Sequence, residues 1–183
     1  MSGNMYRGPI KILVLDVDGV LTDGSLYLTD NGEFLKVFNA RDGVAVALLR
    51  AHGIATGIIS GKSSRALDHR IEQLGIEYSV TGVNDKRSAL DEILCAAGTD
   101  ASSAAYVGDD VIDLPLAGHV QLFFAVSDAH PLVLQGADHV LKTSGGRGAV
   151  REAAEQILLG GGLSLTAAYE PLICQQRMRT IVQ

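Results

Sequence analysis

The sequence is short of cysteine and of long apolar runs. Only two cysteines occur among 183 residues, Cys95 and Cys174, and their spacing matches neither a disulfide framework nor a metal site. No segment approaches the roughly 20 apolar residues that a membrane-spanning helix needs. The segment from Met1 to Pro9 lacks the apolar core of a signal peptide. We therefore expect a cytoplasmic protein.

Clustered positive charge is also missing. The chain carries 15 Lys and Arg against 21 Asp and Glu, a net charge of -6, and no block of basic residues. We therefore expect no nucleic-acid partner and no anionic-membrane partner. The length suits one folded domain with a sizeable core, which we place at residues 1–162, followed by a C-terminal tail at 163–183.

Two acidic residues stand directly after an apolar run near the N-terminus. The run from Ile12 to Leu15 is typical of a strand buried on both faces of a parallel sheet, so Asp16 is expected at its carboxyl end. Ligands of open α/β sheets bind at that edge. Asp18 lies two residues further on, where an extended chain directs both carboxylates to the same side, and Gly19 permits a sharp turn. The pattern indicates a phosphoryl-transfer site.

An Asp-x-Asp-Gly segment after a strand also fits a calcium loop or a plain turn. A calcium loop needs a Glu at its twelfth position, and counting from Asp16 that position is Tyr27. This count weakens the calcium alternative and leaves the plain turn open.

A second apolar run ends at Ser60, Gly61 and Lys62. A hydroxyl, a flexible backbone amide and a cation at the start of a helix suit a phosphate, because amides at a helix N-terminus favour anions. An ordinary helix cap by Ser60, Ser63 or Ser64 explains the same residues equally well.

A third apolar run ends at three acids within a few residues, Asp109, Asp110 and Asp113. Crowding of like charge is costly unless a cation is present, and a hard divalent ion is the natural occupant. Lys86 lies between the second and third runs, at the start of a predicted helix. A solvated surface lysine is the default interpretation of that residue.

Strand-like and helix-like segments alternate along the chain, which indicates an α/β fold with a doubly wound, mostly parallel sheet. An Asn-Gly pair between two extended runs predicts a β-hairpin at about 25–38. The hairpin is too short to be a separate lid, so no cap domain is expected. We predict helices at about 42–51, 63–74, 86–97 and 148–159, and strands at 12–15, 54–59, 104–107, 122–126 and 139–141.

The predicted hairpin carries more apolar side chains than one thin flap can bury: Leu26, Leu28, Phe34 and Phe38. Either one face of the hairpin packs on the parent sheet, or another subunit covers it. A cleft without a cap needs walls that exclude water and contact the leaving group. A second subunit is the simplest source of those walls.

Taken together, these segments resemble the four motifs of the haloacid-dehalogenase-like phosphatase superfamily. The motifs appear in order as Asp16-Val17-Asp18-Gly19, Ser60-Gly61, Lys86 and Gly108-Asp109-Asp110 with Asp113. The resemblance implies that Asp16 is the nucleophile. It implies that Asp18 is the general acid that protonates the leaving alkoxide and then activates water against an aspartyl-phosphate.

The resemblance to the superfamily implies ligands as well. Magnesium would be held by the Asp16 carboxylate, the Asp18 main-chain carbonyl and Asp109, with Asp110 or Asp113 ordering its waters. The transferring phosphoryl oxygens would be bound by Ser60, the Gly61 amide and Lys86.

Further segments resemble one family within this superfamily, the 3-deoxy-D-manno-octulosonate 8-phosphate phosphatases. These segments are the hairpin with residues 38–43, then 58–62, 108–115 and 145–152. The resemblance implies a cytoplasmic, magnesium-dependent homotetramer that frees an eight-carbon sugar acid for lipopolysaccharide synthesis. Hairpins would meet at the tetramer centre, and C-terminal tails would approach a neighbour's site.

The same resemblance makes Arg41 and Lys62 candidates for contacts with the sugar acid. Lys62 stands where the family usually has Arg, so the charge is kept while the bidentate fork for a carboxylate is lost. Three alternatives stay open: a related phosphatase acting on a nine-carbon sialic-acid-type 9-phosphate, a non-catalytic tetramerising domain, and a metal-binding regulatory module. The tetramerising domain predicts loss of an acid or lysine from the motifs, and none is lost here.

Overall fold

The structure is a computed structural model that describes residues 8–30 and 32–181, without the side chains of 175–181. Six parallel strands form its central sheet, in the order β5-β4-β1-β6-β7-β8. The predicted doubly wound α/β fold is confirmed. The strands are β1 (Ile12–Leu15), β4 (Ala55–Ser60), β5 (Tyr78–Thr81), β6 (Ala104–Gly108), β7 (Leu122–Ala125) and β8 (His139–Val140).

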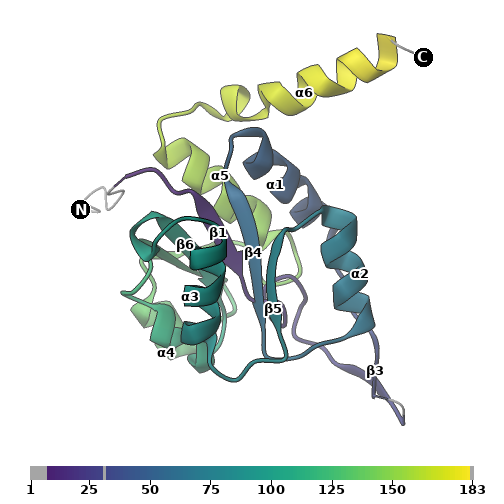
Figure 1. Cartoon of the computed structure of the whole chain (residues 1–183), viewed down its shortest axis with the longest axis vertical. Helices are drawn as coiled ribbons and strands as arrows, with labels where there is room; N and C mark the ends of the chain where they lie inside the picture. Colours follow the sequence, from purple (N-terminus) through teal and green to yellow (C-terminus); the bar gives the residue numbers. More distant parts are fainter. Residues whose placement is uncertain (1–7, 31, 182–183) are drawn as a thin grey trace.

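Helices cover both faces of this sheet (Figure 1). Helix α1 packs against α5 and β4, whereas α3 packs against β4, β5 and the 3-10 helix η2. Figure 1 shows α3 and α4 on one side of the strands and α1 and α2 on the other. The helices are α1 (Ala40–Ala51), α2 (Arg65–Leu74), α3 (Lys86–Ala96), η1 (Ala101–Ser103), η2 (Val111–Leu116), α4 (Pro131–Gly136), α5 (Ala149–Gly160) and α6 (Leu165–Ile181).

Strand β1 lies at the centre of the sheet. All four of its residues are buried, as expected of a parallel strand covered on both faces. Its last residue, Leu15, pairs with Ile58 of β4 and Val107 of β6. The chain goes on from β1 through β4 to β5 on one side and returns to β6 on the other, so the strand order reverses beside β1. Segments that follow these three strands therefore converge where open α/β sheets bind ligands.

Besides the two 3-10 helices, one strand and two α-helices were not predicted from the sequence: β5, α4 and α6. Strand β5 is only four residues long and partly exposed. Its sequence therefore contains no continuous apolar run that would predict a buried strand. Helix α4 has only six residues and begins with Pro131, at a position where the missing N–H costs nothing. Among the residues with described placement, no single helix is long and apolar enough to cross a membrane. One pair bent by 112°, Ala149–Gly160 with Leu165–Cys174, passes that test together.

The segment between β1 and α1 contains the predicted hairpin, formed by β2 (Tyr27–Thr29) and β3 (Gly32–Leu35). The hairpin is a separate two-stranded sheet that projects from the body at the lower right of Figure 1. Leu28 is 67% exposed and Phe34 is 74% exposed. These two side chains therefore do not pack on the parent sheet, and that alternative is wrong for them.

Helix α6 lies across the top of the domain in Figure 1 and continues beyond it. Ala168 is fully buried in a small cluster with Leu48 of α1 and Leu158 of α5. The Ala168 carbonyl also lies 2.8 Å from Nε2 of His52, and the Arg151 guanidinium stacks 4.8 Å from the centre of the Tyr169 ring. The first half of the tail is thus packed on the domain.

Candidate active site

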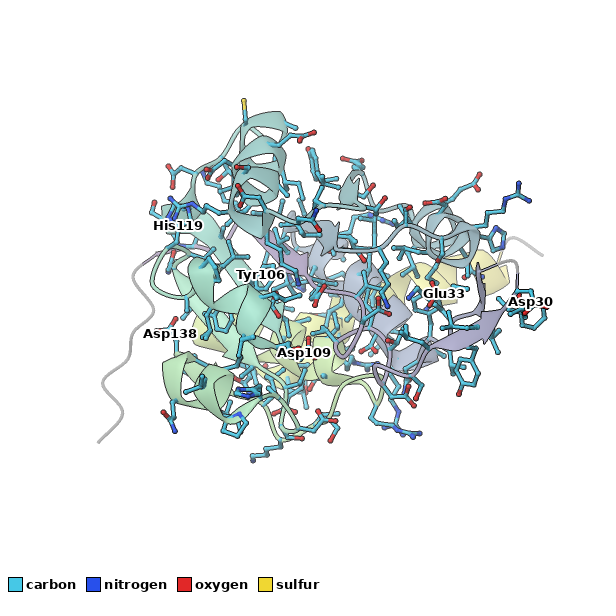
Figure 2. The ribbon with its side chains drawn as sticks, turned by 90° about the horizontal axis from the view of Figure 1, so that it is seen from below. Asp30, Glu33, Tyr106, Asp109, His119 and Asp138 are labelled. Carbon is cyan, nitrogen blue, oxygen red and sulfur yellow. The ribbon has the colours of Figure 1, made fainter. Side chains whose placement is uncertain are left out.

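A cleft of about 260 Å³ opens at the carboxyl ends of β1, β4 and β6. Seen from below in Figure 2, Asp109 lies near the middle of the molecule, beyond the strand ends. The cleft brings together residues from all four motifs. Its lining consists of Asp16, Asp18, Gly24, Leu26, Gly61, Lys62, Lys86, Asp109, Asp110 and Ile112.

Lys86 is a buried lysine between two aspartates. Its Nζ lies 2.8 Å from Oδ2 of Asp16 and 2.6 Å from Oδ1 of Asp113, and its side chain is 3% exposed. Burial lowers the pKa of Lys86, but the two carboxylates raise it further, so the pKa stands above its usual value. The solvated surface lysine is therefore wrong as an interpretation. Asp85 caps α3 one residue earlier and fixes where Lys86 begins the helix.

Asp113 is fully buried and fully used by hydrogen bonds. Its Oδ1 accepts from Lys86 and, at 2.7 Å, from the Tyr106 hydroxyl. Its Oδ2 accepts the backbone N–H groups of Asp109 at 3.0 Å and Asp110 at 3.2 Å. Asp113 therefore positions Lys86 and the loop after β6.

Tyr106 was not singled out from the sequence. It lies in β6, whose residues are all buried, and its sequence neighbours there are apolar. A buried Tyr hydroxyl needs a hydrogen-bond partner. A tyrosine within an apolar strand was therefore the sequence signal that could have pointed to Tyr106.

Asp109 has the features of a cation ligand. Its Oδ1 is buried and has no hydrogen-bond partner. Carboxylate oxygens of Asp16, Asp109 and Asp113 lie within 4.8 Å of one another. Burial and the neighbouring carboxylates raise the pKa of both Asp109 and Asp16. A hard divalent cation relieves this repulsion and uses the unpaired oxygen, so the residues fit such an ion.

Three glycines make room for the acids. A Cβ on Gly19 would lie 2.0 Å from Oδ2 of Asp109, and a Cβ on Gly108 would lie 2.7 Å from Asp113. Gly145 supports the same loop from behind, because a Cβ there would lie 1.8 Å from the Gly19 carbonyl oxygen. The loop after β1 can approach the acids only without these side chains.

Ser60 is buried at the end of β4, and Ser64, not Ser60, caps α2 by accepting the Leu67 N–H. Ser60 Oγ instead accepts the N–H of Lys62 at 3.2 Å. Gly61 and Lys62 are exposed and line the cleft. Ser64 therefore supplies the helix cap, so the helix-cap explanation of Ser60 is wrong.

The comparisons with known proteins agree with one another. A curated relative, the 3-deoxy-D-manno-octulosonate 8-phosphate phosphatase of Escherichia coli K12, is 43% identical over 153 residues, which is 84% of this chain and 81% of the relative. The chain belongs to this phosphatase family. The predicted resemblance and the predicted phosphatase class are therefore confirmed, although no family model matches the chain.

Solved structures of the family superpose closely on this chain. The cobalt-bound Haemophilus influenzae phosphatase is 41% identical with a TM-score of 0.83, and the match covers 87% of this chain and 92% of that one. The Moraxella catarrhalis phosphatase, in complex with magnesium, phosphate and KDO, is 35% identical with a TM-score of 0.79 over 82% and 87% of the two chains. The comparisons favour the phosphatase over the nine-carbon, tetramerising and regulatory alternatives.

Asp18 makes a contact that sequence reasoning about the family motifs missed. Its Oδ1 lies 2.5 Å from Nζ of Lys36, directly after β3, and the same Nζ lies 2.8 Å from Oε1 of Glu33. Burial lowers the pKa of Lys36, but both carboxylates raise it more, so it stands above its usual value. Lys36 was not singled out from the sequence, because no local pattern distinguishes it from an ordinary surface lysine on a hairpin.

Two predicted site residues are exposed and lie outside the buried cluster of Asp16, Lys86 and Asp113. Asp110 is exposed at the cleft, and its carboxylate caps η2 by accepting the Val111 N–H. Arg41 is exposed in the first turn of α1, beside Gly148, and does not line the cleft. Of the two predicted sugar-acid contacts, only Lys62 is at the cleft in a single chain.

Proposed function

We propose that this chain is a magnesium-dependent phosphomonoesterase that hydrolyses 3-deoxy-D-manno-octulosonate 8-phosphate to the free sugar acid and phosphate. The reaction would serve lipopolysaccharide biosynthesis in the cytoplasm. Membership of the phosphatase family supports the substrate. The observation that carries the chemistry is the buried Asp16 at the end of β1, held 2.8 Å from Lys86 inside the cleft.

In the proposed reaction, the Asp16 carboxylate attacks phosphorus and the bond to the substrate oxygen breaks. Asp18 donates a proton to the departing alkoxide, which leaves as the sugar alcohol. Asp18, now a carboxylate, removes a proton from water, and the resulting hydroxide attacks the aspartyl-phosphate. Phosphate leaves, Asp16 is regenerated and Asp18 is again protonated. Each proton taken in one step is returned in the other.

The phosphoryl oxygens would be bound by the Ser60 hydroxyl, the Gly61 amide and Lys86. Lys86 lies between Asp16 and Asp113, so its charge is held where the oxygens carry negative charge during transfer. The Asp16 carboxylate, the main-chain carbonyl of Asp18 and Asp109 would hold Mg²⁺. Bound there, the ion supplies positive charge that offsets repulsion between an anionic nucleophile and an anionic ester.

Substrate selection would involve Lys62 at the cleft wall. An ammonium group there can pair with the carboxylate of the sugar acid, as a point charge. Arg41 remains a proposed contact for the sugar acid. The length of chain from 1 to 162 would form the catalytic domain, and 163–183 would be an appended tail.

A homotetramer would complete the cleft. The hairpins present exposed apolar side chains, including Leu28 and Phe34, and are proposed to meet at the tetramer centre. An exposed apolar surface on a thin flap is typical of a protein interface. The tail is proposed to approach the site of a neighbouring copy, although its last two residues, 182–183, lie outside the described part of the chain.

Phosphate release tests the proposal. The purified chain is given 3-deoxy-D-manno-octulosonate 8-phosphate, a nine-carbon sialic-acid-type 9-phosphate, or 4-nitrophenyl phosphate, each with Mg²⁺ and after chelation. We expect magnesium-dependent release with a strong preference for the eight-carbon ester. Preference for the nine-carbon ester would overturn the substrate and keep the chemistry, and absence of any release would overturn the phosphatase.

A further inference from the structure

The contact between Lys36 and Asp18 joins the hairpin to the catalytic loop. Lys36 follows β3, yet its side chain is only 1% exposed. A buried ammonium is costly unless it is paired, and both carboxylates within its reach, Asp18 and Glu33, are used. Such a contact has one defined geometry, unlike an exposed surface ion pair.

The surroundings of Lys36 make this contact distinctive. β2 is exposed along its whole length, and three of the four residues of β3 are exposed. Glu33 is the second residue of β3 and is labelled to the right of Asp109 in Figure 2, and its side chain is 11% exposed. A flap whose strands are mostly exposed thus places one buried cation on a residue of the cleft.

We propose that Lys36 is a positioning residue for the general acid: it holds Asp18 by Oδ1, leaves Oδ2 free for proton transfer to the substrate oxygen, and ties this orientation to the hairpin. Glu33 holds Lys36 in place from the hairpin side. The proposal rests on the proposed function in one respect, the role of Asp18 as acid. It adds a residue outside the four motifs to the reaction.

Leaving-group chemistry distinguishes positioning of the acid from general support of the fold. An alkoxide is a poor leaving group and needs a proton, whereas 4-nitrophenolate departs without one. The ratio kcat/KM covers the steps up to departure of the leaving group, so hydrolysis of the aspartyl-phosphate does not enter it. A displaced Asp18 therefore lowers kcat/KM for an alkyl ester and spares the aryl ester.

The experiment compares Lys36→Met with Lys36→Arg and with wild type, in the full chain with Mg²⁺. For Lys36→Met we expect kcat/KM to fall about 100-fold on the sugar phosphate, near the lower limit for loss of a general acid, and less than about threefold on 4-nitrophenyl phosphate. Lys36→Arg keeps a cation and should recover much of the loss. Lys11→Met, an exposed lysine at the opposite end of β1, is the matched control and should match wild type on both esters.

Equal losses on the two esters would overturn the proposal, because a merely structural lysine affects both alike. Unchanged rates on both would also overturn it. If Lys36→Met does not fold, Glu33→Gln provides the second test, with an expected fall of about fivefold confined to the alkyl ester.

A different natural substrate does not blur the test of Lys36. If wild type prefers another ester, the proposed substrate fails, and the comparison is then made between that alkyl ester and 4-nitrophenyl phosphate. If Asp18→Asn, as a single substitution, lowers kcat/KM equally on both esters, Asp18 is not the general acid. The proposed positioning role of Lys36 is then wrong as well.

Discussion

The cleft and the hairpin differ in how far contacts within one chain bury and pair their side chains. In the cleft, Asp16, Lys86 and Asp113 are at most 7% exposed and bonded to one another. In the hairpin, Phe34 and Leu28 are mostly exposed, and no other sheet of the described chain pairs with β2 or β3. The buried acids and the lysine of the cleft are therefore paired within one chain, whereas the exposed apolar side chains of the hairpin fit the proposed contact with another subunit. Lys36 is where the two regions meet.

The largest expected effect comes from breaking the cleft. Asp16→Asn should lower phosphate release at least about 1000-fold, because the amide cannot form the covalent intermediate. The free energy of unfolding should hold or rise, since the change removes repulsion with Asp109. Phosphate release and thermal unfolding, measured on the same samples, check both halves of the prediction.

Asp68→Asn, on the exposed face of α2, is the matched control for Asp16→Asn. It should retain full activity. Release at a tenth of the wild-type rate or more from Asp16→Asn would contradict the assignment of the nucleophile.

A substitution in the hairpin should change the assembly of the protein and leave the stability of the single chain nearly unchanged. Phe34→Ser removes an exposed aromatic ring, so unfolding of a single chain should change by less than about 0.5 kcal/mol, as for other surface substitutions. The molecular mass in solution should fall, because the proposed tetramer contact loses apolar area. Light scattering across a range of protein concentrations measures this mass.

Leu132→Ser, equally apolar and 52% exposed but on α4, is the control for the hairpin variant. It should leave the mass unchanged. An unchanged mass for Phe34→Ser would place the subunit contact elsewhere or remove it.

The two regions also differ in how far their structure could be predicted from the sequence. The central strands were predictable because runs such as Ile12–Leu15 are apolar throughout and end abruptly in acids. The position of Asp16 followed from the rule for strand ends, whereas the convergence of Lys86 with it was implied only by the resemblance to the superfamily. Neither signal depends on distant contacts.

The elements missed depend on packing that no local pattern encodes. Tyr106 belongs to the site only because η2 brings Asp113 back to β6, and Lys36 only because the chain directly after β3 returns to Asp18. Strand β5 is short and half-exposed, so its apolar pattern is weak. Arg41 was predicted from its motif, but the first turn of α1 carries it away from the cleft.

A buried carboxylate outside the cleft sharpens the comparison. Asp42, in the first turn of α1, is 1% exposed, and its Oδ1 accepts the Arg151 N–H at 3.2 Å. Its Oδ2 is buried without a hydrogen-bond partner. Burial raises the pKa of Asp42 to about 6, although hydrogen bonds from α5 and the charges of Arg70 and Arg151 act to lower it. Unlike Asp16, this acid forms no ion pair with a lysine in the described part of the chain.

The smallest expected effect is a pH-dependent change of stability in Asp42→Asn. A folded-state pKa near 6, above the unfolded value of 3.8, means that the folded protein binds the proton more tightly. Stability from this group is full below pH 4 and is lost as the pH rises through 6. Asn mimics the protonated acid, so the variant should match wild type near pH 4 and exceed it by about 3 kcal/mol at pH 7. Urea unfolding at the two pH values, with Asp68→Asn alongside, measures the difference, and an equal shift at both pH values would show that repacking, and not the buried charge, controls this site.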